Sequence, residues 1–302
     1  MIPKGATYRE VVEILKREGV IQRGPPLLLL GRITGSDRRV MAGYYNLNTR
    51  MSVWDVFKIL RDGRIIQYAV TIPPGSTLMD IKKNLETFGL IDDNSWGIVY
   101  DKRFLKSLNI DAPSLEGYIY PDTYNLPKGI KPDDIFSMMV QRMREMYDEP
   151  LRKRAQEMGM SERDVLTLAS IIEKEAMHDS ERPLISAVYH NRLKRGMRLQ
   201  ADPTVLYGIR EGSRDIRYSD LKRHTPYNTY YIVGLPPGPI ASPSIKSVRA
   251  ALYPANVDYL FFVSRNDGTH HFSLTGEEHE QAVMVYQRNV DASNSEAKGF
   301  RR

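Results

Sequence analysis

The chain has 302 residues, enough for one large domain or two smaller ones, each with a sizeable apolar core. Because cysteine is absent, disulfide bonds, thiolate zinc sites and cysteine nucleophiles are excluded. The net charge of +6 suits a nucleic acid, a membrane surface or a cell wall as partner without choosing among them, and the sequence lacks the run of about 18 apolar residues that a membrane-spanning helix needs.

The first predicted elements form a repeated unit. Residues 7–18 have apolar side chains at helical spacing after Thr7, a residue type that caps helices. The stretch IPKGATYREVVEILKREGVI at 2–21 aligns without a gap with IPPGSTLMDIKKNLETFGLI at 72–91. A turn followed by a capped amphipathic helix therefore occurs twice, which indicates a small internal duplication. Between the two copies, residues 52–63 predict another capped helix.

A domain boundary is predicted near residue 112, so that regions 1–112 and 113–302 are separate. Residues 115–134 are rich in tyrosine, proline and glycine, which favours an ordered loop with a short strand. One helix is predicted to follow, from about Pro132 to Gln156.

The C-terminal region predicts a loop, a helix and a hairpin. Residues 220–245 hold many prolines and glycines but little charge, and residues 244–253 look helical. Two strands then flank the turn Asn266-Asp267-Gly268. His270 and His271 lie in the second strand, where alternation sends neighbours to opposite faces, so we expect no metal site there.

The stretch MSERDVLTLASIIEKEA at 160–176 predicts a helix that carries two glutamates near its end. Ser161 and Asp164 have the spacing of a capping box. The expected solvated face comprises Arg163, Thr167, Ser170 and Lys174. Glu173 and Glu175 fall instead within the wide apolar arc, roughly 200° apart around the helix, so they do not form a close carboxylate pair.

A glutamate in an apolar wall has its pKa raised by desolvation, as a general acid near neutral pH requires. The other glutamate is expected to accept hydrogen bonds from nearby backbone, or from Arg192 or Arg198. The helix pattern does not choose between Glu173 and Glu175. It also leaves open that both are structural residues with arginine partners.

Amide and aromatic side chains follow the two glutamates in the sequence. They comprise Asn191, Gln200, Asp202, Thr204 and Tyr207, and then Tyr227, Asn228, Thr229 and Tyr230. Such a set suits stacking on sugar rings and bonding to their hydroxyl and N-acetyl groups. Nucleic acid is disfavoured because lysine and arginine are not interleaved with these aromatics. No phosphate loop, histidine-glutamate zinc pattern or G-x-S-x-G elbow occurs, and we expect no metal or cofactor.

Four motifs give the chain a family resemblance. LASIIEKEA, NRLKRGMRLQADPTVLYG, YNTYYIVGLPPGPIASP and EGYIYPDTY together resemble the YceG-like family, the endolytic murein transglycosylases called MltG, with matching order over essentially the whole chain. The resemblance implies an α+β fold. Its N-terminal part would be a LysM-like β-α-α-β module that binds or positions glycan, followed by a mixed α/β catalytic domain with a central catalytic helix.

The resemblance also implies roles for particular residues. Glu175 would be the catalytic acid because a small residue, Ala176, follows it, and Glu173 stays the alternative. Substrate contacts would come from Gln200, Asp202, Thr204, Tyr227, Asn228, Tyr230, Tyr124 and Asn191.

The implied reaction is cleavage within peptidoglycan glycan strands, between N-acetylmuramic acid and N-acetylglucosamine. A single glutamate would act as acid and then base, leaving 1,6-anhydro ends, and the cut would end strand growth beside peptidoglycan synthases. Two alternatives stay open: a two-carboxylate muramidase with Asp202 as the second acid, and a non-catalytic peptidoglycan-binding scaffold.

The resemblance also implies a location. The chain opens inside a structural pattern with no signal peptide before it, which fits either a cytoplasmic protein or a missing N-terminal segment. Family members usually begin with a transmembrane helix. We therefore expect the full-length protein on the extracytoplasmic face of the cytoplasmic membrane, held by an N-terminal anchor that this chain lacks.

Overall fold

The computed structural model describes residues 1–209 and 216–288, which form two compact units. Unit 1 comprises residues 1–71, 84–92 and 123–135, and unit 2 comprises residues 72–83 and 93–122 and the chain from residue 136 onward. The units thus interleave along the sequence, whereas the predicted boundary at residue 112 is a single cut. The functional division into 1–112 and 113–302 stays a prediction. Within the described ranges, no helix has the length and apolarity needed to cross a membrane.

Unit 1 is built on three short helices, α1 (Tyr8–Arg17), α2 (Pro25–Thr34) and α3 (Val53–Arg61). Their apolar faces form one core, in which Val11, Leu27, Val56 and Leu60 have no more than 1% exposure. Among residues 1–66, strand pairing is limited to isolated bridges, Ile2 with Gly43 and Tyr45 with Ile65. Three helices with bridges differ from the expected β-α-α-β order, so the LysM-like module is not confirmed.

A two-stranded antiparallel sheet completes unit 1. β1 (Gln67–Thr71) pairs with β2 (Thr123–Pro127), in a register that places Val70 opposite Tyr124. The short strand expected within 115–134 is therefore present as β2.

The predicted duplication appears in the local structure. A threonine directly precedes each of α1 and α4 (Leu78–Thr87), namely Thr7 and Thr77. The hydroxyl of each threonine accepts a hydrogen bond from the backbone N–H of the residue three positions later, Glu10 or Asp80. Each helix is followed by a left-handed glycine, Gly19 with φ +68° and Gly89 with φ +62°. Both ends of the unit are thus fixed by the same local chemistry in both copies.

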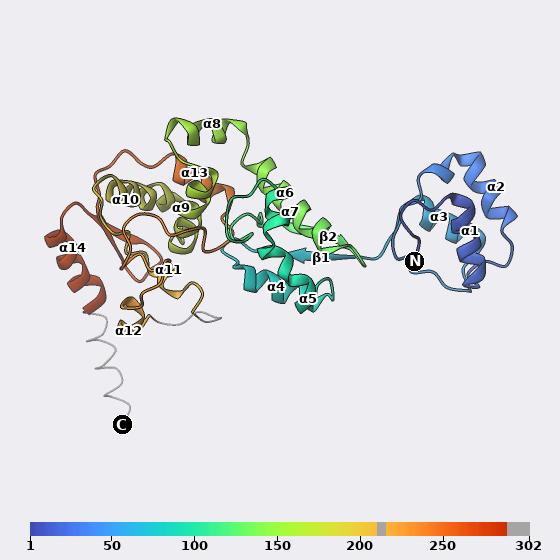
Figure 1. The fold of residues 1–302 in the computed structure, drawn as a ribbon, viewed down its shortest axis with the longest axis horizontal. Helices are drawn as coiled ribbons and strands as arrows, with labels where there is room; N and C mark the ends of the chain where they lie inside the picture. The colour runs from blue at the N-terminus through green and yellow to red at the C-terminus, as the bar shows by residue number, and fades with distance from the viewer. Residues whose placement is uncertain (210–215, 289–302) are drawn as a thin grey trace, which may run out of the picture. The chain divides into compact units, whose positions relative to one another are not determined.

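Most of the remaining elements belong to unit 2 (Figure 1). The prediction of a single helix over 132–156 is wrong, because the segment forms two helices, α7 (Pro132–Met146) and α8 (Glu149–Glu157). Asp148 accepts the Leu151 N–H as the cap of α8, and Pro150 has no N–H to continue α7. From residue 93 onward, the elements besides β2 are α5 (Asp93–Trp96), η2 (Gly97–Tyr100), α6 (Lys102–Ser107), α7 (Pro132–Met146), α8 (Glu149–Glu157), α9 (Glu162–Glu175), η3 (Asp179–Glu181), α10 (Arg182–Lys194), α11 (Asp202–Leu206), α12 (Tyr218–Leu221), α13 (Ile245–Leu252), β3 (Phe261–Ser264), β4 (His270–Ser273), α14 (Gly276–Val283) and η4 (Met284–Arg288).

α9 is the central helix of unit 2. It packs against α8, α10, α11 and α13, as the grouped ribbons of α9, α10 and α13 illustrate (Figure 1). The predicted C-terminal hairpin is confirmed: β3 and β4 are antiparallel, and Asn266 in the turn has φ +64°. The chain as a whole is a mixed helix and strand fold with small sheets, and most of its unit 2 core is made by helices around α9.

Candidate active site

α9 begins and ends as its local sequence directs. Ser161 and Asp164 form the predicted capping box, with the hydroxyl accepting the Asp164 N–H and the carboxylate accepting the Ser161 N–H. The helix ends at Glu175, because Ala176 has an extended backbone with ψ 120°. Both glutamates therefore lie in the last turn of a helix whose start is firmly fixed.

The predicted solvated face of α9 is wrong at its centre. Every residue from 165 to 172 is buried, including Thr167 at 1% and Ser170 at 0% exposure. The Ser170 hydroxyl donates to the Thr167 carbonyl and accepts the Ile240 N–H at 3.0 Å. The loop around Ile240 covers Ser170, which the helical pattern assigns to solvent, and α9 is buried on all sides from residue 165 to residue 172.

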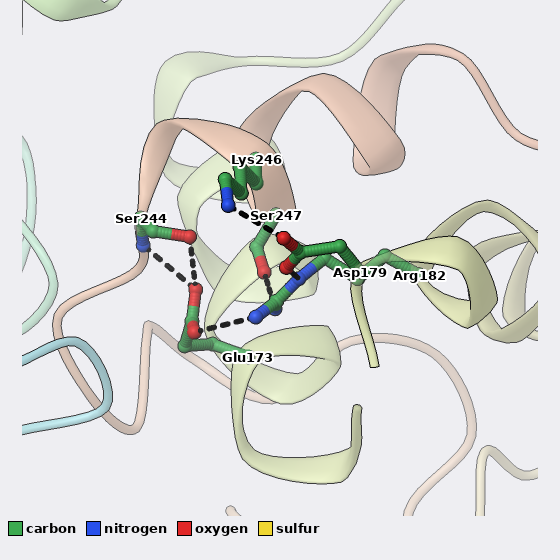
Figure 2. A network of polar contacts seen from close by, with 6 residues as sticks. All are labelled: Glu173, Asp179, Arg182, Ser244, Lys246 and Ser247. Carbon is green, nitrogen blue, oxygen red and sulfur yellow. Dashed lines mark hydrogen bonds and ion pairs between the residues drawn. The ribbon is translucent and has the colours of Figure 1, made fainter. Parts of the chain in front are cut away.

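Glu173 has a complete set of partners (Figure 2). Its Oε2 accepts both the backbone N–H of Ser244 at 2.8 Å and the Ser244 hydroxyl at 2.5 Å. Its Oε1 lies 3.1 Å from Arg182 Nη2, in an ion pair whose side chains are only 5% and 10% exposed. The arginine partner is therefore Arg182, and the expectation of Arg192 or Arg198 is wrong.

The same arginine extends the network to α13. Arg182 also donates to Asp179 and to Ser247, and Asp179 in turn accepts from Lys246 (Figure 2). Glu173 thus joins the end of α9 to the starts of α10 and α13. One cation and two hydrogen-bond donors fill the acceptor positions of the Glu173 carboxylate, which suits a structural role.

Glu175 lies in the opposite electrostatic environment. Burial is the main cause that raises its pKa to about 7, and the negative charge of Asp202 raises it further. Two donors oppose this shift: the Tyr189 hydroxyl, 3.1 Å from Oε1, and the backbone N–H of Asp202. Within the described residues Glu175 has no cationic partner. A carboxyl group in this setting is half protonated near neutral pH.

Asp202 opens α11 beside Glu175. Its carboxylate is exposed and accepts the Tyr230 hydroxyl at 2.6 Å. This bond and burial together raise the pKa of Tyr230 well above its usual range. Glu175, Asp202 and Tyr230 therefore form one connected polar group, drawn from α9, α11 and the tyrosine-rich loop.

Gln200 is held in a strained backbone conformation just before Asp202. Its φ of +49° lies in the left-handed region, which glutamine rarely adopts. Its N–H donates to the Thr229 carbonyl, and its side-chain carbonyl accepts from Arg192 at 3.3 Å. The Gln200 side chain is exposed, two residues before Asp202 in the sequence.

Three of the predicted contact residues are turned toward the protein itself. Thr204 is 0% exposed and bonds to Ala201 and Thr229. Asn228 is 1% exposed and its amide donates to two carbonyls of its own loop, while the Asn191 amide donates to Val257 and Tyr259. These hydrogen bonds tie the three side chains to neighbouring loops of unit 2, which suits a scaffold role.

The two remaining predicted tyrosines have different placements. Tyr227 is partly exposed and packs on Tyr207 with ring centroids 4.6 Å apart. Tyr124 is 6% exposed and belongs to β2 of unit 1, whereas every other candidate belongs to unit 2.

Sequence reasoning missed Glu116. This acid is 4% exposed, and burial raises its pKa to about 7. The signal for it was available, because Glu116 lies in LEGYIY among apolar and aromatic residues, as Glu175 does in IIEKEA. The tyrosine, proline and glycine content of this segment predicts a loop, and a loop pattern does not indicate that Glu116 is buried.

Comparison with known proteins agrees with this architecture. A model of the YceG-like family matches residues 1–285. The endolytic murein transglycosylase of Bacillus subtilis strain 168 is 33% identical over 94% of this chain and 83% of that protein. The protein of the same name from Streptococcus pneumoniae D39 is 27% identical over 94% of this chain, which spans 57% of its length.

A solved structure extends the similarity to three dimensions. The crystal structure of a YceG-like protein from Listeria monocytogenes superposes with a TM-score of 0.66 and 32% identity, over 93% of this chain and 96% of that one. A family model that spans almost the whole chain, together with relatives above 30% identity, settles the relationship: this chain belongs to the YceG-like family.

Proposed function

We propose that this chain cuts murein glycan strands internally, with Glu175 as a single acid and base. The family membership makes it an enzyme of the lytic transglycosylase class, and such enzymes are lyases. The observation that carries the proposal is the desolvated Glu175 carboxyl, whose pKa of about 7 keeps a proton available at neutral pH. Glu173 is instead engaged by Arg182 and Ser244, which suits a structural role.

The proposed reaction has two proton transfers. Glu175 donates its proton to the glycosidic oxygen between N-acetylmuramic acid and N-acetylglucosamine as the C1–O bond breaks. The resulting carboxylate then takes the proton of the muramoyl C6 hydroxyl, whose oxygen bonds to C1 and closes a 1,6-anhydro ring. Because no water enters, a second carboxylate for water activation is not required, unlike in a hydrolase.

The neighbours of Glu175 support this cycle. The Tyr189 hydroxyl and the Asp202 N–H stabilise the carboxylate that forms after proton donation. The charge of Asp202 favours reprotonation and suits the positive character of an oxocarbenium-like transition state. Gln200 and Tyr230 flank the same group and are the candidates for contacts to the sugar.

Asp202 also favours one competing mechanism. As an exposed carboxylate next to Glu175, it is the residue that a two-carboxylate muramidase would use to activate water. That reaction incorporates a water oxygen into the new end, whereas the anhydro reaction does not.

The pH profile tests the role of Glu175. Since the resting acid must be protonated, we expect kcat/KM on purified murein glycan strands to fall tenfold per pH unit above about pH 7. If kcat/KM instead rises above pH 7, Glu175 acts as a base in the resting enzyme, and the proposal is overturned.

The proposal extends to location. A murein substrate places the enzyme in the cell envelope, and we propose that the full-length protein works at the outer face of the cytoplasmic membrane near peptidoglycan synthases. Fractionation of cells that produce the tagged full-length protein tests this: recovery in the cytosol would contradict it.

A further inference from the structure

Glu116 is a buried acid outside the Glu175 group. Its Oε2 accepts the backbone N–H of Leu78 at 3.1 Å and the Tyr207 hydroxyl at 3.2 Å. Its Oε1 is buried and has no hydrogen-bond partner among the described residues. An acid in this position destabilises the fold relative to an apolar residue of similar size, so its presence calls for a function other than packing.

The bond to Tyr207 connects Glu116 with two further tyrosines. Tyr207 packs against Tyr227 with ring planes 48° apart. The charge of Glu116 also contributes to raising the pKa values of Tyr100 and Tyr227, so both hydroxyls lie near it. Two rings, Tyr207 from the end of α11 and Tyr227 from the 225–231 loop, therefore lie at one buried carboxyl group, and Tyr100 of η2 is within electrostatic range of it.

These three rings are open to a ligand, unlike the neighbouring tyrosines. Tyr100 is 49% exposed, and Tyr207 and Tyr227 are partly exposed. By contrast Tyr118 and Tyr120, from the segment that carries Glu116, are 3% and 8% exposed and pack in the core. Partly exposed rings with fixed orientation are suited to stacking on the apolar faces of sugars.

The tyrosine cluster lies close to the proposed catalytic group along the chain. Asp202 and Tyr207 stand five residues apart across α11, a rise of about 8 Å in a helix. The backbone that carries Tyr207 thus lies a short distance from the backbone of Asp202, whose N–H contacts Glu175.

We propose that Tyr100, Tyr207 and Tyr227 form a sugar-stacking platform beside the scissile bond, and that Glu116 is a positioning residue that fixes Tyr207 in it. The platform rests on the proposed function for its ligand, the murein glycan strand. It would hold sugars that are not cut, so its contribution belongs to binding and to KM more than to kcat.

A binding assay tests the platform independently of turnover. Purified peptide-free murein glycan strands are titrated into the Glu175→Gln protein, which binds without cutting. Adding Tyr227→Ala or Tyr100→Ala is expected to weaken binding about 3- to 10-fold each, the size of one lost stacking contact. Tyr253→Ala, which removes a 50% exposed tyrosine elsewhere in unit 2, is the matched control and should leave binding unchanged.

The role of Glu116 is tested in the otherwise native enzyme. Glu116→Leu removes the acceptor for Tyr207 and is expected to raise KM about tenfold with kcat changed less than threefold. Glu116→Gln keeps an acceptor oxygen and should restore KM to within about threefold of native. If Glu116→Leu does not fold, Tyr207→Phe, which deletes only the hydroxyl, carries the same expectation.

Two results would overturn the proposal. One is unchanged binding in both tyrosine variants; the other is a loss confined to kcat in the folded Glu116 or Tyr207 variants. A native enzyme that binds glycan through these rings but forms no cleaved product would instead refute the proposed function and leave the platform standing.

Discussion

Glu173 and Glu175 are two residues apart on α9, yet their carboxyl groups have opposite surroundings. Glu173 has a cation and two donors, whereas Glu175 has a buried setting and a neighbouring negative charge. The first arrangement ties the carboxylate to its neighbours, whereas the second raises the pKa of Glu175 to about 7, so that its carboxyl group exchanges a proton near neutral pH. The environment of each side chain, rather than its position in the sequence motif, separates the two roles.

The first prediction concerns activity at Glu175. Glu175→Gln should leave the fold intact and lower the cleavage rate by about 10²- to 10⁴-fold, because an amide does not donate a proton as a carboxylic acid does. The rate of soluble fragment release from purified murein is the measurement. Retention of more than about a tenth of the native rate would remove Glu175 as the acid.

The second prediction concerns stability at the same residue. Because the folded-state pKa of about 7 lies above the unfolded value of 4.5, the native state binds more protons between these two pH values. Glu175 therefore lowers the free energy of unfolding as pH rises through this window, by up to about 3 kcal/mol above pH 7. Glu175→Gln should unfold at a higher temperature than the native protein at pH 8, and the two should converge near pH 4. Equal melting temperatures at pH 8 would contradict the raised pKa.

The third prediction concerns Glu173. Glu173→Gln leaves the charge of Arg182 buried with a weakened partner, at a cost of about 3–5 kcal/mol in the free energy of unfolding. Protein that stays folded should keep most of its cleavage rate. The control is Glu157→Gln, which breaks a solvent-exposed pair with Arg154 and should cost less than about 1 kcal/mol. Urea unfolding measures both, and a Glu173 variant as stable as the control would refute the structural role.

At the level of secondary-structure elements, the two copies of the duplicated unit share their ends. Gly19 and Gly89 are both left-handed, and an added Cβ would meet no atom within 4 Å at either position. The fourth prediction is that Gly19→Ala and Gly89→Ala each cost about 1 kcal/mol, from backbone strain alone.

Gly276→Ala is the control for this pair. That glycine also has open space around it but no left-handed φ, and it stands at the start of α14, where alanine is tolerated or better. Thermal unfolding should place the first two variants together and below the control. A large difference between Gly19→Ala and Gly89→Ala would mean that the copies have diverged in structure.

The elements that the sequence predicted correctly are those fixed by local chemistry. The cap at Thr7, the capping box at Ser161, the duplicated helices and the Asn266 turn each depend on residues within a few positions. The errors arose where distant segments decide. The Ile240 loop buries Ser170, and no helical periodicity contains that information. In the same way, the sequence pattern does not predict that Arg182 pairs with Glu173. The two side chains meet only in the fold, beside Ser244 at the start of α13.

The candidate site divides along the same line. The motif around Glu175 is recognisable because its residues are contiguous, and Asp202 and Tyr230 form a connected polar group with it in the structure. Thr204, Asn191 and Asn228 belong to the same motifs, yet their side chains bond inward, since a motif also contains the residues that build its loops. Proximity in sequence does not distinguish a ligand contact from a scaffold contact.

At the scale of the whole molecule, the proposed function requires cleavage within murein glycan strands. We expect the proposed tyrosine platform to bind sugars on one side of the cut, and Gln200 and Tyr230 to bind sugars on the other. Early digests should therefore contain mid-length fragments while the longest strands disappear first. Steady release of disaccharides from strand ends would contradict an endolytic mode.

The most direct test of the central claim is the chemistry of the new end. Purified murein glycan strands are digested in water enriched in oxygen-18, and the fragments are analysed by mass spectrometry. A single-glutamate transglycosylase gives 1,6-anhydro-muramoyl ends that carry no heavy oxygen, and these products are absent with Glu175→Gln. Reducing muramic acid ends that carry one oxygen-18 would contradict the account and assign the enzyme as a hydrolase that uses Glu175 with Asp202.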